Sequence, residues 1–315
     1  MRIIFIGTPD FAVPVLRGLL SGGHQIVAVV TRPDRPAGRG RRLMPPPVKT
    51  FAVEHGLALS QPPSLRREVV AQELTEMKPE AMVVAAYGRI IPPEVLAIPT
   101  RGVLNIHPSL LPRYRGPSPV VSAILEGEDV TGVTVMLMDQ GLDTGPILAQ
   151  RQASVLPREA AGDLTHRLFT LGAELLLEVL PQWQAGTIQP VPQDEALATS
   201  TRLHTKEDGE MDWSQPADAL DRRLRAFNPW PGCYTRWAGK LLKVLEGVPA
   251  GDADSRESGP GRVVSLPGGG KPSVSVMTGQ GLLGLVTVQL EGRQPQTIED
   301  FVRGHPRFLD AVLPS

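Results

Sequence analysis

An amide and an imidazole stand two residues apart in the segment Asn105-Ile106-His107-Pro108. Alternate residues of an extended chain point to the same face, so the side chains of Asn105 and His107 can reach one common atom. Two N–H donors that converge on a carbonyl oxygen stabilise the negative charge that develops there when a nucleophile adds to the carbonyl carbon. The same pattern also fits a histidine that ends a strand and only satisfies its neighbours, and the pair alone does not decide between these interpretations.

A carboxylate in a glycine-rich loop supplies a third group for such chemistry. Asp143 is bracketed by glycines in a loop that joins two expected strands, Thr131–Asp139 and Pro146–Ala153. Aspartate beside glycine often forms only an Asx turn; alternatively, Asp143 faces His107 and exchanges a proton with the reactants. No second histidine or cysteine stands at metal-ligand spacing from these residues, so we do not expect a metal site.

Short runs rich in valine and isoleucine alternate with amphipathic segments over the first half of the chain. The runs predict strands at Arg2–Gly7, Gln25–Thr31, Ala81–Tyr87 and Gly102–His107, and the amphipathic segments predict helices at Ala12–Leu20, Val48–His55, Arg67–Met77 and Asp163–Leu180. Buried strands separated by helices imply a parallel sheet covered on both faces, with an antiparallel pair at one edge. Asn105 and His107 would then end a strand at the carboxyl edge, where open parallel sheets bind ligands.

The turn after the first strand does not carry a dinucleotide fingerprint. Gly7 is followed by Thr8, Pro9 and Asp10, whereas a pyrophosphate site needs the glycines of G-x-G-x-x-G. The carboxylate of Asp10 would also repel a pyrophosphate, so we do not expect NAD. Phe11 in the same turn is either a core residue or the floor of a substrate cleft at the acceptor end.

The second part of the chain lacks the alternation of apolar runs and amphipathic segments seen in the first half. Residues 182–204 contain isolated prolines and no sustained period, as a linker does. Short strands punctuated by glycine and proline follow at Gly232–Val248, Gly261–Leu266, Ser273–Thr278 and Leu282–Gly292, with a helix at Ile298–Arg303. We predict a catalytic domain over residues 1–188, a linker over 189–206 and a small barrel over 207–315, because a chain of 315 residues is near the size at which domains divide.

The composition excludes several classes of protein. A net charge of −1 with 41% hydrophobic and 21% charged residues is typical of a globular protein. No run approaches the roughly 18 apolar residues of a membrane span, and the run Ile3–Ile6 is too short for a signal peptide. A single cysteine, Cys233, excludes a disulfide framework, so we expect a reducing cytoplasm.

Net positive charge is found in one part of the chain. Residues 1–60 hold eight basic and three acidic residues, whereas the rest of the chain holds 24 basic and 30 acidic ones. The basic residues of the segment 32–49 are Arg32, Arg35, Arg39, Arg41, Arg42 and Lys49, opposed only by Asp34. Such a run is commonly a solvated loop; alternatively, its arginines bind the phosphates of a nucleic acid in this one place.

Several separated motifs resemble the 10-formyltetrahydrofolate-dependent formyltransferases. They are Asn-x-His-x-Ser-Leu-Leu-Pro from Asn105, Arg-Gly-x-x-Pro from Arg115, and Asp-x-Gly-Leu-Asp-Thr-Gly from Asp139. Four more segments resemble the branch of that family that formylates initiator methionyl-tRNA: GTPDFA (7–12), PDRPAGRGRRLMPPPVK (33–49), Tyr87–Pro92 and RAFNPWPG (225–232). The resemblance runs from residue 2 to beyond residue 290, and its departures at Pro108 and Arg202 cast little doubt on the chemistry.

The resemblance implies a Rossmann-like domain without a dinucleotide site, followed by a small OB-like barrel. It implies that Asn105, His107 and Asp143 are catalytic, and that 10-formyltetrahydrofolate passes its formyl group to the methionine of initiator methionyl-tRNA. The folate site would be lined by Ser109, Leu110, Leu111, Pro112, Arg89, Ile90, Ile91 and Gln140. The basic segment would contact the tRNA, neither metal nor NAD would take part, and the enzyme would be a cytoplasmic monomer.

Other functions share part of this pattern. A formyltransferase acting on a small amine, such as glycinamide ribonucleotide or an amino sugar, would need the three polar groups but neither the basic segment nor a second domain. A formyltetrahydrofolate hydrolase would use water as the acceptor and is compatible with the same groups. An RNA-binding module on an inactive scaffold would not need Asn105, His107 and Asp143 together.

Overall fold

The computed structural model describes residues 1–37, 42–251, 259–265, 272–309 and 311–314, and the chain divides into two compact units. Unit 1 comprises Met1–Pro119, Asp129–Val155 and Leu164–Arg202. Unit 2 comprises Val120–Glu128, Leu156–Asp163 and Leu203–Ser315. The units are not continuous along the chain, unlike the predicted domains with boundaries near residues 188 and 207. Two short segments before residue 164 group with the C-terminal part.

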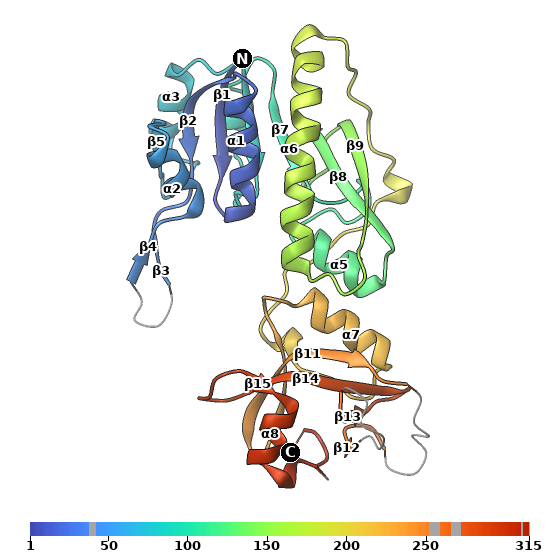
Figure 1. Cartoon of the computed structure of the whole chain (residues 1–315). Coiled ribbons are helices and arrows are strands. Elements are labelled where there is room, and N and C mark those ends of the chain that lie inside the picture. Colours follow the sequence, from blue (N-terminus) through green and yellow to red (C-terminus); the bar gives the residue numbers. More distant parts are fainter. Residues whose placement is uncertain (38–41, 252–258, 266–271, 310, 315) are drawn as a thin grey trace. The chain divides into compact units, whose positions relative to one another are not determined.

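Unit 1 is built on a sheet whose described strands have the order β5-β2-β1-β6-β7-β8-β9 (Figure 1). These strands are β1 (Arg2–Gly7), β2 (Gln25–Val30), β5 (Leu59–Ser60), β6 (Ala81–Ala85), β7 (Val103–His107), β8 (Val130–Leu137) and β9 (Ile147–Ser154). The pairs from β5 to β7 are parallel, and β7, β8 and β9 pair antiparallel. The predicted α/β class and the antiparallel pair at one edge are both confirmed.

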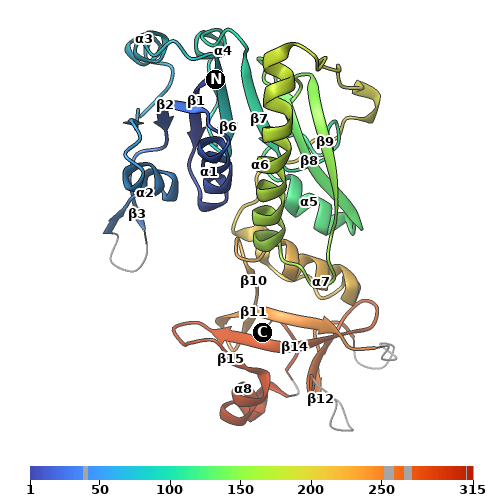
Figure 2. The ribbon, with the colours of Figure 1, turned by 45° about the horizontal axis from the view of Figure 1, so that its top comes forward.

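Helices cover both faces of this sheet. The helices α1 (Val13–Ser21), α2 (Pro47–Glu54) and α6 (Ala161–Ala185) bury apolar side chains with one face of the sheet, while α3 (Glu68–Glu76) and α4 (Pro93–Leu96) do so with the other (Figures 1 and 2). The strands are buried from both sides, which explains why β1 and β6 are almost entirely apolar. Burial of this apolar surface is the main favourable term in forming the unit.

The strand β7 has two chemically different faces. Leu104 and Ile106 point into the core beneath α6, and Asn105 and His107 alternate with them toward the other face. Gly172 lets α6 approach this strand closely, since a Cβ built there would lie 2.6 Å from Cγ2 of Ile106. A core packed to contact behind β7 fixes the position of the polar side chains in front of it.

The basic segment forms a hairpin, which its sequence did not predict. The strands β3 (Arg35–Ala37) and β4 (Arg42–Met44) pair antiparallel, with Arg35 opposite Met44. The hairpin extends away from the sheet of unit 1 (Figure 1). Each strand has only three residues and prolines lie nearby, so no alternating pattern was long enough to indicate pairing.

Unit 2 contains an antiparallel sheet whose described strands have the order β10-β11-β14-β13-β12, with β15 paired to β14. The strands are β10 (Cys233–Trp237), β11 (Lys240–Pro249), β12 (Val263–Ser265), β13 (Val274–Met277), β14 (Leu282–Leu290) and β15 (Gln296–Thr297). The helix α8 (Ile298–Gly304) closes the unit, and α7 (Ala217–Ala226) packs on β11 and β14. This antiparallel sheet confirms the predicted OB-like class, whereas α7 and the short helix α5 (Pro119–Glu126) were not predicted.

Among the residues that the structure describes, no helix is a candidate for a membrane span. Although α6 spans 25 residues, neither it nor any other described helix is apolar enough over a sufficient length to cross a bilayer.

Candidate active site

The carboxyl end of β7 carries the two polar residues that the sequence singled out. Asn105 and His107 are both buried, with 9% and 4% of their surface exposed. The register sets Asn105 beside Val84 of β6 and Met136 of β8, and His107 opposite Thr134. Because both neighbouring strands are hydrogen-bonded to β7, the spacing of the two side chains is fixed by the sheet.

A backbone carbonyl orients the imidazole of His107. The ring Nε2 lies 2.9 Å from the carbonyl oxygen of Tyr114, in the loop that follows β7. A carbonyl oxygen only accepts, so Nε2 carries a proton in this hydrogen bond. The other ring nitrogen, Nδ1, is left to face the site, where it lies 3.6 Å from Oδ2 of Asp143.

The loop between β8 and β9 brings the carboxylate of Asp143 to this position. Its side chain is 13% exposed, and Oδ2 accepts a hydrogen bond of 2.8 Å from the backbone N–H of Gly116. The separation of 3.6 Å from the imidazole exceeds hydrogen-bond length. Contacts of this kind often tighten only when substrate binds.

The Asx turn expected as the alternative role for Asp143 is formed by a different residue. Oδ1 of Asp139 accepts from the backbone N–H of Gly141 at 2.9 Å and from Oγ1 of Thr144 at 2.7 Å. Asp143 instead has a left-handed backbone with φ of 55°, which aims its side chain at the His107 loop. The structure thus separates the two aspartates of this loop into a turn former and a group facing the imidazole.

Asn105 is the polar group of the three that is left open. Its side chain forms no hydrogen bond with any residue that the structure describes, although it is buried. A buried amide normally finds partners within the fold. The free amide of Asn105 shares one face of β7 with His107, whose Nδ1 lies 3.6 Å from the Asp143 carboxylate. Such a set of groups can serve a bound carbonyl: the amide and a doubly protonated imidazole can donate to its oxygen, and the carboxylate can accept a proton.

A hydrogen-bonded network shapes the proline-rich loop after β7. Oγ1 of Thr134 donates to the Ser109 carbonyl at 2.6 Å and accepts from the Leu111 N–H at 3.1 Å, and Gln150 donates to the Leu111 carbonyl at 2.8 Å. Ser109 is completely buried and its hydroxyl donates to the Arg113 carbonyl at 2.7 Å. Ser109 and the buried Leu111 therefore shape the loop, while the half-buried Leu110 and Pro112 present the surface that a ligand can touch.

The remaining residues predicted for the folate site lie in two loops of unit 1. Arg89, Ile90 and Ile91 follow β6: the guanidinium of Arg89 donates to the Pro63 carbonyl, Ile90 is 72% exposed and Ile91 is buried. Gln140 is exposed in the loop between β8 and β9 (residues 139–145, the carboxylate loop), three residues before Asp143. The exposed side chain of Ile90 is therefore available to contact an apolar part of a ligand, whereas Ile91 packs in the core.

Phe11, expected either in the core or in a cleft, is half-buried in the short helix η1 (Asp10–Ala12). Its ring contacts Phe169 and His166 of α6, with centroid separations of 4.9 and 5.8 Å. Nε2 of His166 lies 3.3 Å from Oδ2 of Asp10. One edge of Phe11 therefore belongs to the core and the other stays at the surface beside a polar pair.

Most described cations of the basic segment already have partners at the foot of the hairpin. Lys49 pairs with Asp34 at 2.7 Å, and this ammonium, together with the Gln61 amide, holds the pKa of the Asp34 carboxyl below its ordinary value. Arg32 donates to the Gly88 carbonyl, and burial lowers the pKa of its guanidinium. Arg35 is exposed; Arg39, Arg41 and the side chain of Arg42 lie outside the described residues.

Sequence reasoning missed the contribution of the segment expected to be a linker. Thr199 and Thr201 hydrogen-bond with the backbone of residues 112–118, and Gln193 and Glu195 contact Arg115. Arg115 was noticed only as part of a motif and was given no role. Polar residues in an aperiodic stretch gave no signal, because their partners are remote in sequence.

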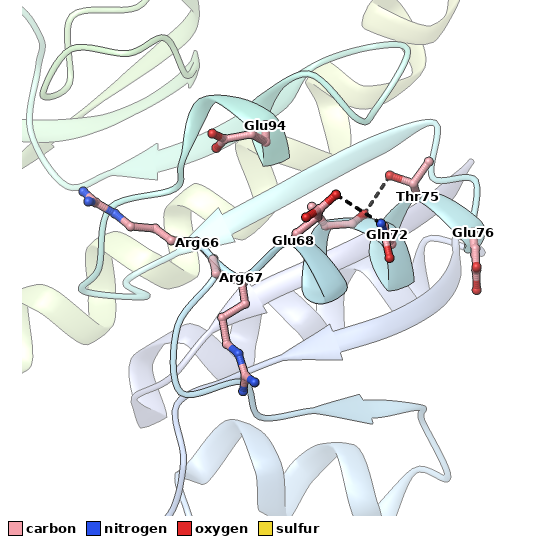
Figure 3. Close-up of a pocket in the computed structure, with 9 residues that line it drawn as sticks. Arg66, Arg67, Glu68, Gln72, Thr75, Glu76 and Glu94 are labelled. Atoms are coloured by element: carbon pink, nitrogen blue, oxygen red, sulfur yellow. Dashed lines mark hydrogen bonds between the residues drawn. The ribbon is translucent and has the colours of Figure 1, made fainter.

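A surface pocket in unit 1 is separate from these groups. It has a volume of about 600 Å³ and lies on α3 and α4, where it is lined by Arg66, Arg67, Glu68, Glu76, Glu94 and uncharged neighbours. Figure 3 shows Arg66 and Arg67 extending in different directions rather than converging on one point. None of the predicted site residues lines this pocket. No group of three or more His, Cys, Asp or Glu residues able to hold a metal occurs among the described residues.

Two family models match the chain and together span most of it. Residues 1–180 match the model described as formyl transferase, and residues 204–306 match that of the formyl transferase C-terminal domain. A methionyl-tRNA formyltransferase from Chloroflexus aurantiacus is 51% identical over 304 residues, covering 96% of this chain and 97% of that protein. The protein of the same name from Anaeromyxobacter sp. strain K is 46% identical over 305 residues, covering 96% and 97%.

Solved structures resemble the fold at lower identity. HypX from Aquifex aeolicus in complex with tetrahydrofolic acid has a TM-score of 0.65 at 22% identity, and the match covers 99% of this chain but only 48% of that longer protein. An N-formyltransferase from Helicobacter canadensis, in complex with folinic acid and dTDP-3-aminofucose, has a TM-score of 0.64 at 16% identity and covers 94% and 100%.

Proposed function

Because the chain belongs to the formyl transferase family, we propose that it transfers the formyl group of 10-formyltetrahydrofolate to the α-amino group of methionine on initiator methionyl-tRNA. Relatives of nearly full coverage and 46–51% identity carry the name of this activity. The observation that carries the proposal within the structure is that the open Asn105 amide and His107 share one face of β7, where Nδ1 of His107 lies 3.6 Å from the Asp143 carboxylate. These groups suit an amine adding to a formyl carbon.

We assign to these groups the direct transfer of the formyl group from the folate to the amine. The methionine amine forms a bond to the formyl carbon, and negative charge develops on the former carbonyl oxygen. Asn105 donates to that oxygen through its amide. His107 donates through Nδ1 in the imidazolium form, in which both ring nitrogens carry a proton, since its Nε2–H is already used by the Tyr114 carbonyl. Oxyanion donors of this kind are typically worth about 2.7–4 kcal/mol each in the transition state.

Asp143 completes the transfer by handling a proton. The attacking amine loses a proton to this carboxylate, the bond between the formyl carbon and the folate nitrogen breaks, and that nitrogen receives the proton that Asp143 had accepted. The products are formylmethionyl-tRNA and tetrahydrofolate. The nucleophile needs little activation because a free α-amino group titrates near about 8, and no covalent intermediate with the enzyme is required.

The folate substrate is assigned to the loops beside these groups. Leu110 and Pro112 would contact it from the loop after β7, Ile90 from the loop after β6, and Gln140 from the carboxylate loop. Support comes from their exposure and from the rigid backbone beneath them, where Thr134 satisfies both Ser109 and Leu111. Ser109, Leu111, Arg89 and Ile91 support this surface from within or from its side.

The tRNA is assigned to the basic hairpin, with a further contribution from unit 2. The exposed Arg35 and the neighbouring arginines of this segment can pair with phosphates, which predicts an affinity that falls as salt rises. Residues 1–188 would then form the catalytic part and residues 207–315 the part that supports the tRNA. We place the activity in the cytoplasm, where translation consumes the product, and assign it to a monomer.

A formyl-transfer assay tests the proposal. Purified protein is incubated with 10-formyltetrahydrofolate and charged initiator tRNA, with charged elongator tRNA alongside, and the aminoacyl group is identified by mass spectrometry. We expect formylmethionine on the initiator species. Formate released at the same rate without tRNA would assign the chain to hydrolases instead, and formylation of glycinamide ribonucleotide or an amino sugar in place of the tRNA would assign it to small-amine transferases.

A further inference from the structure

The side chain of Gln193 lies at the centre of a hydrogen-bond system that joins separate parts of unit 1. The residue is half-buried, in the segment for which no structure was expected. Its amide nitrogen donates to the carbonyl oxygens of Asp143 at 2.8 Å and Gly145 at 2.7 Å. Both N–H groups of the side chain are thus spent on the carboxylate loop.

The amide oxygen of Gln193 is held just as firmly. It accepts from Nε and Nη2 of Arg115 at 3.0 and 2.9 Å. The far edge of this buried guanidinium makes two hydrogen bonds to the Glu195 carboxylate, at 2.9 and 2.8 Å. The hydrogen bonds with Glu195 raise the pKa of Arg115 and lower that of Glu195. Arg115 therefore remains charged and fixes the orientation of the glutamine.

The carboxylate loop needs such an anchor. The strand β8 runs antiparallel to β7 and ends at Leu137 opposite Leu104, three residues before His107. The loop must fold back along the face of the sheet to bring Asp143 within 3.6 Å of the imidazole. The left-handed backbone of Asp143 is uncommon in residues other than glycine, although aspartate adopts it more readily than most, and contacts with the surroundings help to hold it.

The loop that carries Arg115 also orients the imidazole. Tyr114 supplies the carbonyl that binds Nε2 of His107, and Gly116 supplies the N–H that binds Oδ2 of Asp143. The N–H of Arg115 is in turn bound by the Thr199 carbonyl at 2.8 Å. Gln193 thus connects the two loops whose relative position sets the distance between the imidazole and the carboxylate.

We infer that Gln193 is a positioning residue that holds Asp143 against His107 for proton transfer, by bridging the Arg115 guanidinium to the backbone of the carboxylate loop. The polar atoms of its side chain are all used within the protein, so we expect its effect to be on kcat rather than on substrate binding. The kinetic consequence rests on the proposed function; the effect on the geometry of the loop does not.

Steady-state kinetics of Gln193→Leu and Gln193→Glu test this role. The leucine removes every hydrogen bond, while the glutamate keeps an acceptor for Arg115 but turns oxygen toward the two carbonyls of the loop. We expect both variants to lose about 10- to 100-fold in kcat, the effect of a small misplacement of a reacting group, with KM values for folate and tRNA retained. Gln189→Leu, at an exposed glutamine four residues earlier, should match the wild type. Unchanged kcat in both Gln193 variants would overturn the inference.

A double-mutant cycle separates positioning from general support of the fold. If Gln193 acts through Asp143, adding Gln193→Leu to Asp143→Asn should lower kcat little beyond the single Asp143 variant, because the group to be positioned has already lost its charge. Losses that multiply fully would mean that Gln193 acts elsewhere, and the inference would fail.

Hydrogen exchange of the carboxylate loop provides a readout that requires no activity. In full-length Gln193→Leu, amide exchange of residues 139–146 should accelerate relative to the wild type and to Gln189→Leu, because the loop loses its anchor. Equal protection in all three proteins would overturn the inference. An accelerated loop in a protein whose wild type does not formylate methionyl-tRNA would instead leave the anchor intact and refute the proposed function.

Discussion

Two polar segments leave the sheet of unit 1: the carboxylate loop, residues 139–145, and the basic hairpin formed by β3 and β4. They differ in how many hydrogen bonds hold them to the rest of the unit. The carboxylate loop folds back onto the sheet and is bound by Gly116, Gln193 and its own Asp139. The hairpin extends away from the sheet, and ion pairing at its foot joins Lys49 to Asp34 (Figure 1). One region holds a single carboxylate 3.6 Å from an imidazole. The other is a segment whose sequence contains four arginines between residues 35 and 44.

The difference follows from what each partner requires. Proton transfer and oxyanion stabilisation depend on atoms placed within a few tenths of an ångström, so His107 and Asp143 are each held by a hydrogen bond to the backbone. Attraction to a polyanion depends on the number of charges and falls off over about 8–10 Å at physiological salt, so it needs little fixed geometry. Changes in the carboxylate loop should therefore act on kcat, and changes in the hairpin on the KM for tRNA.

The largest effect should come from the carboxylate itself. Asp143→Asn keeps the shape but cannot take a proton, and we expect kcat to fall by about 10²- to 10⁴-fold, the usual contribution of general acid–base catalysis. Asn105→Ala and His107→Ala should each cost at least about a hundredfold, with folate binding retained. Asp129→Asn, an exposed carboxylate before β8, is the control. Turnover close to the wild type in any of the three would remove that residue from the mechanism.

Neutralising the hairpin should change binding instead of turnover. Replacing Arg39, Arg41 and Arg42 with alanine should raise the KM for tRNA and leave kcat and folate affinity unchanged. The slope of log affinity against log salt concentration should become shallower by about 0.7–0.9 for each phosphate that is no longer neutralised. Arg35→Ala should act in the same direction, whereas Lys49→Ala should act less, since Asp34 already compensates that charge. A triple variant with unchanged KM for tRNA would show that the hairpin is only a solvated loop.

The proline-rich loop tests whether rigidity itself is what the active region requires. Ser109→Ala removes a buried hydroxyl that donates to the Arg113 carbonyl, and we expect the free energy of unfolding to fall by about 1 kcal/mol. Folate affinity, measured by calorimetry, should be unchanged because this side chain does not reach the surface. The exposed Ser21→Ala serves as the control for stability. Weaker folate binding at unchanged stability would place Ser109 in direct contact with the ligand.

The smallest effect should be a titration at the foot of the hairpin. Lys49 and Gln61 hold the pKa of Asp34 below its ordinary value of 3.8. A carboxyl whose pKa is lowered in the folded state stabilises the protein at pH values above its pKa in the unfolded chain. This contribution is lost as pH falls through the lowered pKa of the folded state. NMR should therefore find a midpoint below 3.8 for Asp34, moving upward in Lys49→Met. A wild-type midpoint at the ordinary value would mean that the ion pair does not form in solution.

Much of the framework of unit 1 could be predicted from periodicity. The strands β1, β2, β6 and β7 lie where runs of valine and isoleucine placed them, because a strand buried on both faces must be continuously apolar. The alternation of Asn105 and His107 onto one face followed from the same geometry. The hairpin escaped prediction because three-residue strands carry no period, and α7 because its apolar residues are few among its charges.

The sequence alone determined which residues had the chemical types for formyl transfer and that two of them would end a buried strand, because side-chain direction along a strand is a local property. It did not determine how the loop would bring Asp143 to the imidazole, nor that Gln193, fifty positions beyond Asp143, would hold the loop there. Those choices depend on a loop folding back and meeting a segment remote in the chain. Hydrogen bonds between such distant polar groups leave no pattern in a single sequence, so only the tertiary structure decided them.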